Sequence, residues 1–197
     1  MEPEESERQV QELSARDELA LLHLARRVVE VVVSGGRPEF AGEEWGEALN
    51  RRLACFVTLR ARGELRGCIG QLVAREPLWR AVVENAESAA TRDHRFAPVT
   101  ESELEDLEIE LSVLSEPEPV KFATPEDLLD RLRPGMDGVV LRLGGRVSTF
   151  LPQVWEELAD KEEFMEHLSR KAGYEGDAWR GEGVEVSVYQ VRHFAER

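Results

Sequence analysis

Cys68 is the residue of this chain with the clearest capacity for chemistry. It lies in the stretch LRGCIG, residues 65–70, two positions after Arg66. Side chains two positions apart in a strand point to the same side, so the guanidinium could stabilise a thiolate or hold a carboxylate or phosphate. The alternative is structural: Cys68 fills a tight site between Gly67 and Gly70, and Arg66 pairs with Glu110 across a sheet. We favour the pairing slightly for Arg66 and leave both readings of Cys68 open.

The glycines of this stretch predict a strand end that something approaches closely. Gly67 has no Cβ, so a facing element or a ligand can pack against the strand there. Gly70 permits the turn that leaves the strand at low steric cost. The apolar neighbours Leu65 and Ile69 complete the predicted site stretch.

The segment DHRF, residues 93–96, supplies further candidates where a helix is expected to end and a loop to begin. Loops carry function more often than core strands do, so Asp93, Arg95 and Phe96 are candidate binding residues. His94 is the only histidine expected to be able to act as a general base for Cys68. The alternative, which we favour, is a helix-end network anchored by Phe96.

Two other pairs of polar residues have spacings that chemistry could use. Glu108 and Glu110 are two apart, which suits acid–base work but is equally typical of a solvated strand face, and we favour that face. Ser148 and Thr149 follow a glycine turn, although hydroxyls in hairpins usually bond across strands.

Metal and disulfide chemistry are not indicated. The chain has 2 cysteines and 4 histidines, without metal-ligand spacing, so we expect no metal and no cofactor. Cys55 and Cys68 are expected to stay reduced and unbridged. The histidines are His23, His94, His167 and His193.

A hairpin over residues 54–70 is expected to position Cys68. β-forming residues flank a glycine-containing break near Arg62-Gly63. With a two-residue loop, Val57 lies opposite Cys68 and Leu59 opposite Arg66, while Leu65, Gly67 and Ile69 take the other face. A three-residue loop would exchange the faces.

The rest of the chain alternates between helix and strand patterns with no internal repeat. Ser14 and Asp17 can cap a helix that Gly35-Gly36 ends. Gly144-Gly145 suits a primed hairpin turn. Hairpins and mixed element order favour an α+β fold with antiparallel sheets. Further helices are expected over 77–93, 125–132 and 161–172, and strands over 107–113, 138–150 and 184–194.

The overall charge limits the partners. The net charge of −15 repels phosphate backbones, so nucleic acid is an unlikely partner. No run of residues approaches the roughly 18 apolar positions of a membrane span, and the N-terminus has no signal-peptide pattern. We expect a cytoplasmic protein.

Several strings of the sequence occur together in one order: FVTL, LRGCIG, ENAESAATRDHRFAPVT, LEIELSVLSEPEPV, FLPQVWEE and LSRKAG followed by Trp179. Together they resemble one family, the AMMECR domain. LRGCIG is the most specific, and the resemblance covers roughly residues 14–194. One departure is Ser169, where many relatives have a cysteine, which argues against a mechanism that needs a second thiol there.

The resemblance implies two α+β subdomains with a cleft between them that LRGCIG lines. The expected division is 14–118 with 160–197 as the larger subdomain, 119–159 as the smaller one, and 1–13 as an acidic arm. A stand-alone chain of this kind is similar to those of the AmmeMemoRadiSam system, which implies Memo-like and radical SAM partners.

The resemblance supplies no reaction, so two functions stay nearly level. One is binding or modification of a small molecule or protein side chain, with Cys68 as nucleophile and Arg66 as anion clamp. The other is a non-catalytic adaptor domain.

Overall fold

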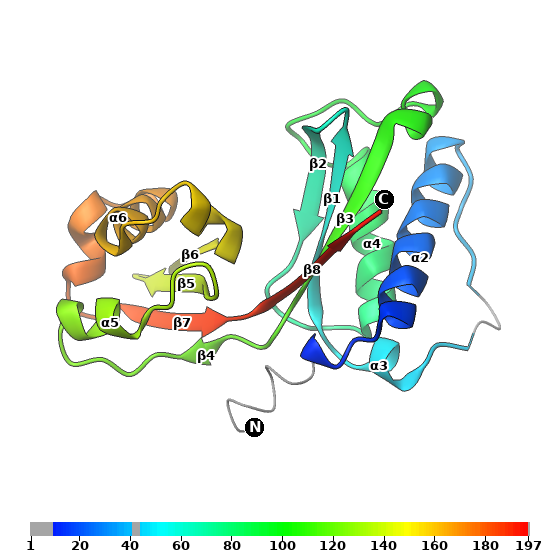
Figure 1. Ribbon diagram of the computed structural model, residues 1–197. Helices are drawn as coiled ribbons and strands as arrows, with labels where there is room; N and C mark the ends of the chain where they lie inside the picture. The colour runs from blue at the N-terminus through cyan, green and yellow to red at the C-terminus, as the bar shows by residue number, and fades with distance from the viewer. Residues whose placement is uncertain (1–9, 41–43, 197) are drawn as a thin grey trace. The chain divides into compact units, whose positions relative to one another are not determined.

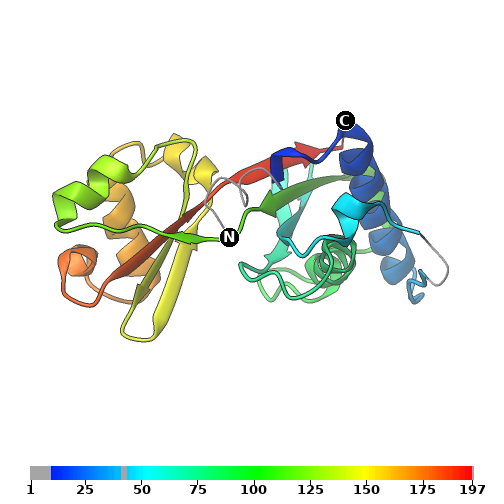
Figure 2. The same ribbon diagram turned by 90° about the horizontal axis from the view of Figure 1, so that it is seen from below.

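A computed structural model describes residues 10–40 and 44–196 (Figures 1 and 2). Contacts group the chain into two units: Met1–Glu116 with Arg192–Arg197, and Pro117–Val191. The sequence analysis instead predicts that residues 160–197 belong to the larger subdomain. The difference arises because the helix Lys161–Lys171 buries Phe164 and Leu168 in the core of the second unit.

The first unit packs helices on a four-stranded sheet with strand order β2-β1-β3-β8. Its main helices, α2 and α4, cover one face of this sheet (Figure 1). The elements are α2 (Ala15–Val33), α3 (Glu47–Asn50), β1 (Ala54–Ala61), β2 (Glu64–Gly70), α4 (Leu78–Thr91), the 3₁₀ helix η1 (Glu101–Asp106), β3 (Leu107–Leu114) and β8 (Val191–Ala195).

Helix α2 begins and ends as the sequence predicts. The Ser14 side chain accepts from the Asp17 N–H, and the Asp17 carboxylate accepts from the Ser14 N–H, which completes the capping box. At the other end Gly35 adopts a φ of 76°, which glycine takes without steric cost. The helix is therefore fixed at both ends by local sequence.

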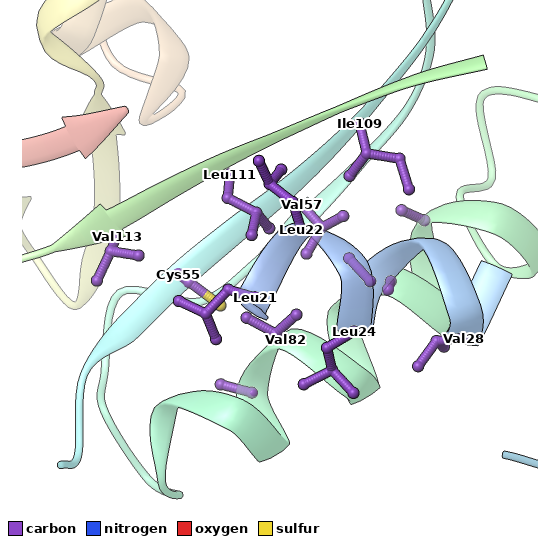
Figure 3. Close-up of a cluster of buried hydrophobic side chains, with 14 of the residues drawn as sticks. Leu21, Leu22, Leu24, Val28, Cys55, Val57, Val82, Ile109, Leu111 and Val113 are labelled. Atoms are coloured by element: carbon purple, nitrogen blue, oxygen red, sulfur yellow. The ribbon is translucent and has the colours of Figure 1, made fainter. Parts of the chain in front are cut away.

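One continuous core lies between the two helices and the sheet (Figure 3). The buried apolar residues of α2, which recur at helical spacing, meet alternate buried residues of β1 and β3. The labelled members are Leu21, Leu22, Leu24, Val28, Cys55, Val57, Val82, Ile109, Leu111 and Val113.

The predicted β1–β2 hairpin is present, but its predicted register is wrong. Arg62 and Gly63 form the turn with positive φ angles of 54° and 84°, as a two-residue primed turn requires. The register then shifts between Leu59 and Arg60, so Arg66 is an extra residue on β2, and Cys68 lies opposite Thr58 rather than Val57. This β-bulge moves Cys68 to the other face, because one extra residue reverses the alternation.

The second unit has its own sheet, with order β4-β7-β5-β6, and its own core. Trp155 stacks on Phe164 with 3.6 Å between ring centroids. Gly144 and Gly145 take positive φ angles, which confirms the predicted turn. The elements are β4 (Glu118–Pro119), α5 (Pro125–Arg131), β5 (Gly138–Leu143), β6 (Arg146–Phe150), η2 (Pro152–Glu156), α6 (Lys161–Lys171), η3 (Gly176–Arg180) and β7 (Glu185–Tyr189).

The α+β class predicted from the sequence is confirmed by these two helix-flanked sheets. Within the described ranges, no helix is both long and apolar enough to cross a bilayer.

Candidate functional site

Cys68 lies on the face of the first-unit sheet opposite to α2 and α4. Its direct partner in the ladder is Thr58, and directly opposed residues share a face. The neighbouring residues Val57 and Leu59 are buried on the helix side, which places Thr58 on the other. The Thr58 hydroxyl donates to the Cys68 Sγ at 3.3 Å, and Cys68 as a residue is partly exposed.

Two residues of the DHRF segment bond to the main-chain N–H and carbonyl groups of Cys68. The Cys68 N–H donates to Asp93 Oδ2 at 2.9 Å, and Arg95 Nη2 donates to the Cys68 carbonyl at 3.2 Å. Because β2 is an edge strand of the sheet, these groups have no neighbouring strand on that side. Asp93 and Arg95 therefore act as a clamp that replaces a missing strand at this residue.

The clamp is itself an ion pair with one buried member. The Asp93 side chain is 2% exposed and lies 2.6 Å from Arg95 Nη2. The hydrogen bond from Arg95, supported by the Cys68 and Arg95 main-chain N–H groups, holds the pKa of the Asp93 carboxyl well below its usual range. The pKa of Arg95 is raised, first by Asp93 and further by interaction with Cys68.

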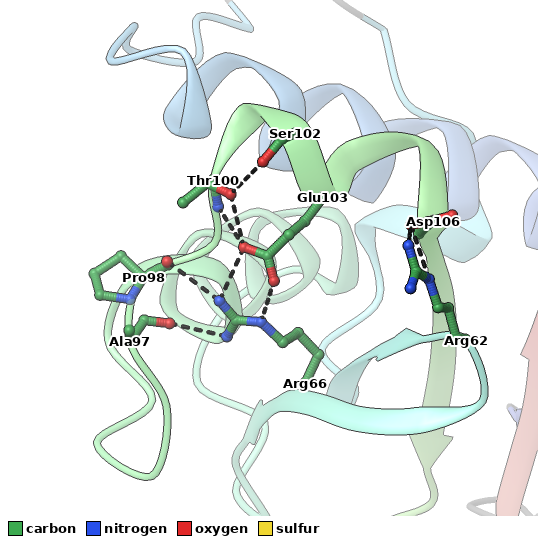
Figure 4. A network of polar contacts seen from close by, with 8 residues as sticks. All are labelled: Arg62, Arg66, Ala97, Pro98, Thr100, Ser102, Glu103 and Asp106. Carbon is green, nitrogen blue, oxygen red and sulfur yellow. Dashed lines mark hydrogen bonds and ion pairs between the residues drawn. The ribbon is translucent and has the colours of Figure 1, made fainter.

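Arg66 is fully engaged in a different network, which Figure 4 shows. Its Nε donates to Glu103 Oε1 at 2.6 Å, and its Nη groups donate to the carbonyls of Ala97 at 2.9 Å and Pro98 at 3.2 Å. Glu103 also accepts from the Thr100 N–H at 2.8 Å. The bulged arginine thus ties β2 to the loop before η1, and the guanidinium has little capacity left for an anion.

The expected bridge between Arg66 and Glu110 is not formed. Arg60 Nε donates to Glu110 Oε1 at 2.6 Å because Arg60 and Glu110 lie on adjacent strands of the same face. His193 approaches the same carboxylate at 3.7 Å. Thr58 is directly opposite Glu110, so Thr58, Glu110 and His193 continue the row that starts at Cys68.

The other predicted site residues divide between the two faces and the loop. Gly67 is buried under α4, Ile69 packs against the core, and Gly70 lies under the Phe56 ring. Leu65 is 37% exposed. The Phe96 ring has the guanidinium carbons of Arg66 and Arg95 at 6.0 and 5.4 Å from its centroid.

Sequence reasoning missed Thr58, Arg60, Glu103 and His193. Glu103 forms a capping box with Thr100, and its pairing with Arg66 could be assigned only with the bulge known. His94 is exposed, and no hydrogen bond joins it to Cys68 among the described residues. In the same part of the chain, no three His, Cys, Asp or Glu side chains are grouped as a metal site would need.

We expect Arg66→Lys to lower the free energy of unfolding by about 1–2 kcal/mol, because lysine cannot reproduce the planar fork that binds one carboxylate and two carbonyls. The pKa of Glu103, lowered to about 2 mainly by its bond to Arg66, should rise in the variant. Urea titration measures the first effect and NMR pH titration the second. An unchanged Glu103 pKa would contradict the assignment.

Comparisons with known proteins agree on one family. A model of the AMMECR1 family matches residues 22–194. A protein of Thermofilum pendens is 39% identical over 195 residues, covering 93% of this chain and 92% of the relative. A protein of Methanocaldococcus jannaschii is 38% identical over 175 residues, covering 87% and 86%.

A solved structure supports the same assignment. The crystal structure of an uncharacterised protein from Pyrococcus horikoshii has a TM-score of 0.83 at 33% identity, with 90% of each chain covered. At this identity and coverage both sequence and fold are shared. The chain therefore belongs to the AMMECR1 family.

Proposed function

We propose that this protein binds a small molecule or a protein side chain at the sheet face that presents Cys68. The observation that carries the proposal is the clamp: the buried Asp93 carboxylate and the Arg95 side chain both bond to the main chain of Cys68, a partly exposed residue. Functional groups are usually held in this way by rigid supporting contacts.

Arg95 gives the proposed ligand a chemical class. Its side chain is 45% exposed, and its hydrogen bonds to Asp93 and Cys68 use Nε and Nη2. The Nη1 group has no hydrogen bond to any described residue, so it can donate to a carboxylate, phosphate or carbonyl oxygen of a ligand. A polar or anionic ligand beside the thiol therefore fits better than an apolar one.

The surroundings of the thiol favour binding over general-base catalysis. In most enzymes a nucleophilic thiol has a general base within hydrogen-bond reach. The side chain that bonds to the Cys68 thiol is the Thr58 hydroxyl, which does not act as a base. His193 lies on β8, three strand spacings from β2, which is about 14 Å. A covalent role for Cys68 would need a base brought by the ligand or partner.

The family resemblance adds partners to this proposal. It implies a Memo-like protein and a radical SAM enzyme, which would supply or receive the ligand. The two free thiols fit a reducing, cytoplasmic setting. The net charge of −15 makes nucleic acid the least suitable ligand.

Alkylation of the folded protein tests the accessibility that the proposal needs, with Cys55 as an internal control. Cys55 is 0% exposed, and burial raises the pKa of its thiol to about 12. We expect iodoacetamide to modify Cys68 in the folded protein and Cys55 only after unfolding, as peptide mass spectrometry will show. Equal protection of both thiols would exclude the proposed site.

Capture of the ligand tests the function itself. Wild type and Cys68→Ser are incubated with fractionated cell extract, and adducts and bound small molecules are identified by mass spectrometry. We expect Cys68→Ser to fold with near-native stability and to lose the captured species. Capture that is identical in both proteins would overturn the proposal.

A further inference from the structure

The free edge of the first-unit sheet lies beside a groove that the proposed Cys68 site does not use. β8 is the last strand in the order β2-β1-β3-β8. A groove of about 1050 Å³ runs between β8 and the N-terminal half of α2, which lie near one another in Figure 2. Its lining residues include Leu19, Leu22, His23, Glu108 and Phe194.

Two ion pairs fix the width of this groove. Arg192 lies 2.6 Å from Glu18, and Glu196 accepts from Arg26 Nε at 3.0 Å. Phe194, between these two residues in sequence, packs against the core. Arg192 in β8 and Glu196 directly after it are thus attached to α2, while the outer edge of the strand stays at the surface.

The outer edge of β8 lacks the covers that two other sheet edges have. The β2 edge is bonded by Asp93 and Arg95 at Cys68, and the β6 edge by Lys171, which donates to the Thr149 carbonyl at 2.8 Å. Within residues 10–40 and 44–196, no side chain bonds to the main chain of Val191–Ala195. Uncovered edges of this kind accept a further strand.

The groove is apolar on one wall and acidic at one end. Leu19, on α2, is 53% exposed and supplies the apolar surface of one wall. Glu108 is exposed and forms no ion pair with any described cation. The net charge of the protein is −15, so its electrostatic field attracts positively charged groups of a partner.

We propose that this groove binds an extended, basic peptide segment of a partner protein, which adds a strand to β8. Its main chain pairs with the β8 edge. Its alternate apolar side chains contact Leu19 and Phe194, and its basic side chains point to the sheet face on which Glu108 lies. Glu108 shares this face with Cys68, but β8 and β2 are at opposite ends of the strand order, so this binding mode does not depend on the thiol.

The test uses a blocked peptide of alternating valine and lysine, about nine residues long, which matches a strand of ordinary length. We expect saturable binding to the full chain by calorimetry and slower hydrogen exchange at those amides of Arg192–Ala195 that face away from β3, the neighbouring strand of β8. Leu19→Lys should weaken binding by about tenfold, because an apolar contact is replaced by a like charge. Val73→Lys, at a position that is 61% exposed and outside the groove lining, is the matched control and should bind as wild type.

Peptide controls separate strand addition from simple charge attraction. A peptide with proline in place of its central valine cannot pair along the edge and should bind much more weakly. A valine–glutamate peptide should not bind. The proposal is overturned if the valine–lysine peptide does not bind, if the proline peptide binds equally well, if Leu19→Lys has no effect, or if the exchange protection lies elsewhere.

Discussion

Gly67→Ala is expected to lower the free energy of unfolding by about 2–3 kcal/mol, at the upper end for overpacking of a core. A Cβ at Gly67 would lie 2.4 Å from the main-chain oxygen of Ala89 in α4. Main-chain atoms cannot rotate away as a side chain can, so α4 itself must move from the sheet. For a chain of this length the melting temperature should fall by about 5–10 °C, measured by circular dichroism.

Gly46→Ala is the matched control for this prediction. A Cβ there meets no atom within 4 Å, and the residue has an ordinary negative φ of −57°. We expect a change within about 0.5 kcal/mol. Equal melting temperatures for Gly67→Ala and Gly46→Ala would show that α4 does not lie as close to β2 as the structure has it.

Asp93→Ala is the second change with a large expected effect, about 2–3 kcal/mol lost from the free energy of unfolding. The substitution leaves the Cys68 N–H without its acceptor and Arg95 without its buried counter-ion. Asp106→Ala serves as control, because its ion pair with Arg62 joins side chains that are 45% and 81% exposed. Exposed pairs contribute at most about 1 kcal/mol.

The Asp93 carboxylate also predicts a pH dependence. Its folded-state pKa is lowered, so its contribution is present above the unfolded pKa of about 3.9 and is lost as the pH falls toward the folded-state value. Wild type should therefore lose stability below about pH 4. Asp93→Ala, measured by denaturation across this range, should lose less; parallel curves would mean that Asp93 is not ionised in the fold.

Most of the fold could be predicted because short stretches of the sequence determine it. The capping box at Ser14, the glycine after α2 and the turn at Arg62-Gly63 all act within a few residues, so their patterns specify structure directly. The α+β class followed from the hairpins. The division between the units could not be read in this way, because it depends on which core α6 joins.

The contacts of the candidate site were predicted only in part, and the bulge at Arg66 is the reason. The structure brings two of the sequence segments singled out, β2 and DHRF, together at Cys68. However, the alternation of apolar and polar residues in β2 gives no sign of the bulge at Arg66. This one extra residue shifts the pairing of the following β2 residues with β1, so that each of them has a different cross-strand neighbour. The arginine that bonds to Cys68, at its main-chain carbonyl, is Arg95, whereas Arg66 bonds to Glu103.

The Asp93–Arg95 clamp holds the main chain of residue 68 independently of the chemistry of its side chain. Its hydrogen bonds to residue 68 end on the N–H and the carbonyl, which every residue except proline possesses. Position 68 can therefore receive a different reactive side chain, such as selenocysteine or an unnatural electrophile, without any rebuilding of its support. The clamp therefore supports the main chain at position 68 whichever side chain stands there, and cysteine is one of several reactive side chains that it could present.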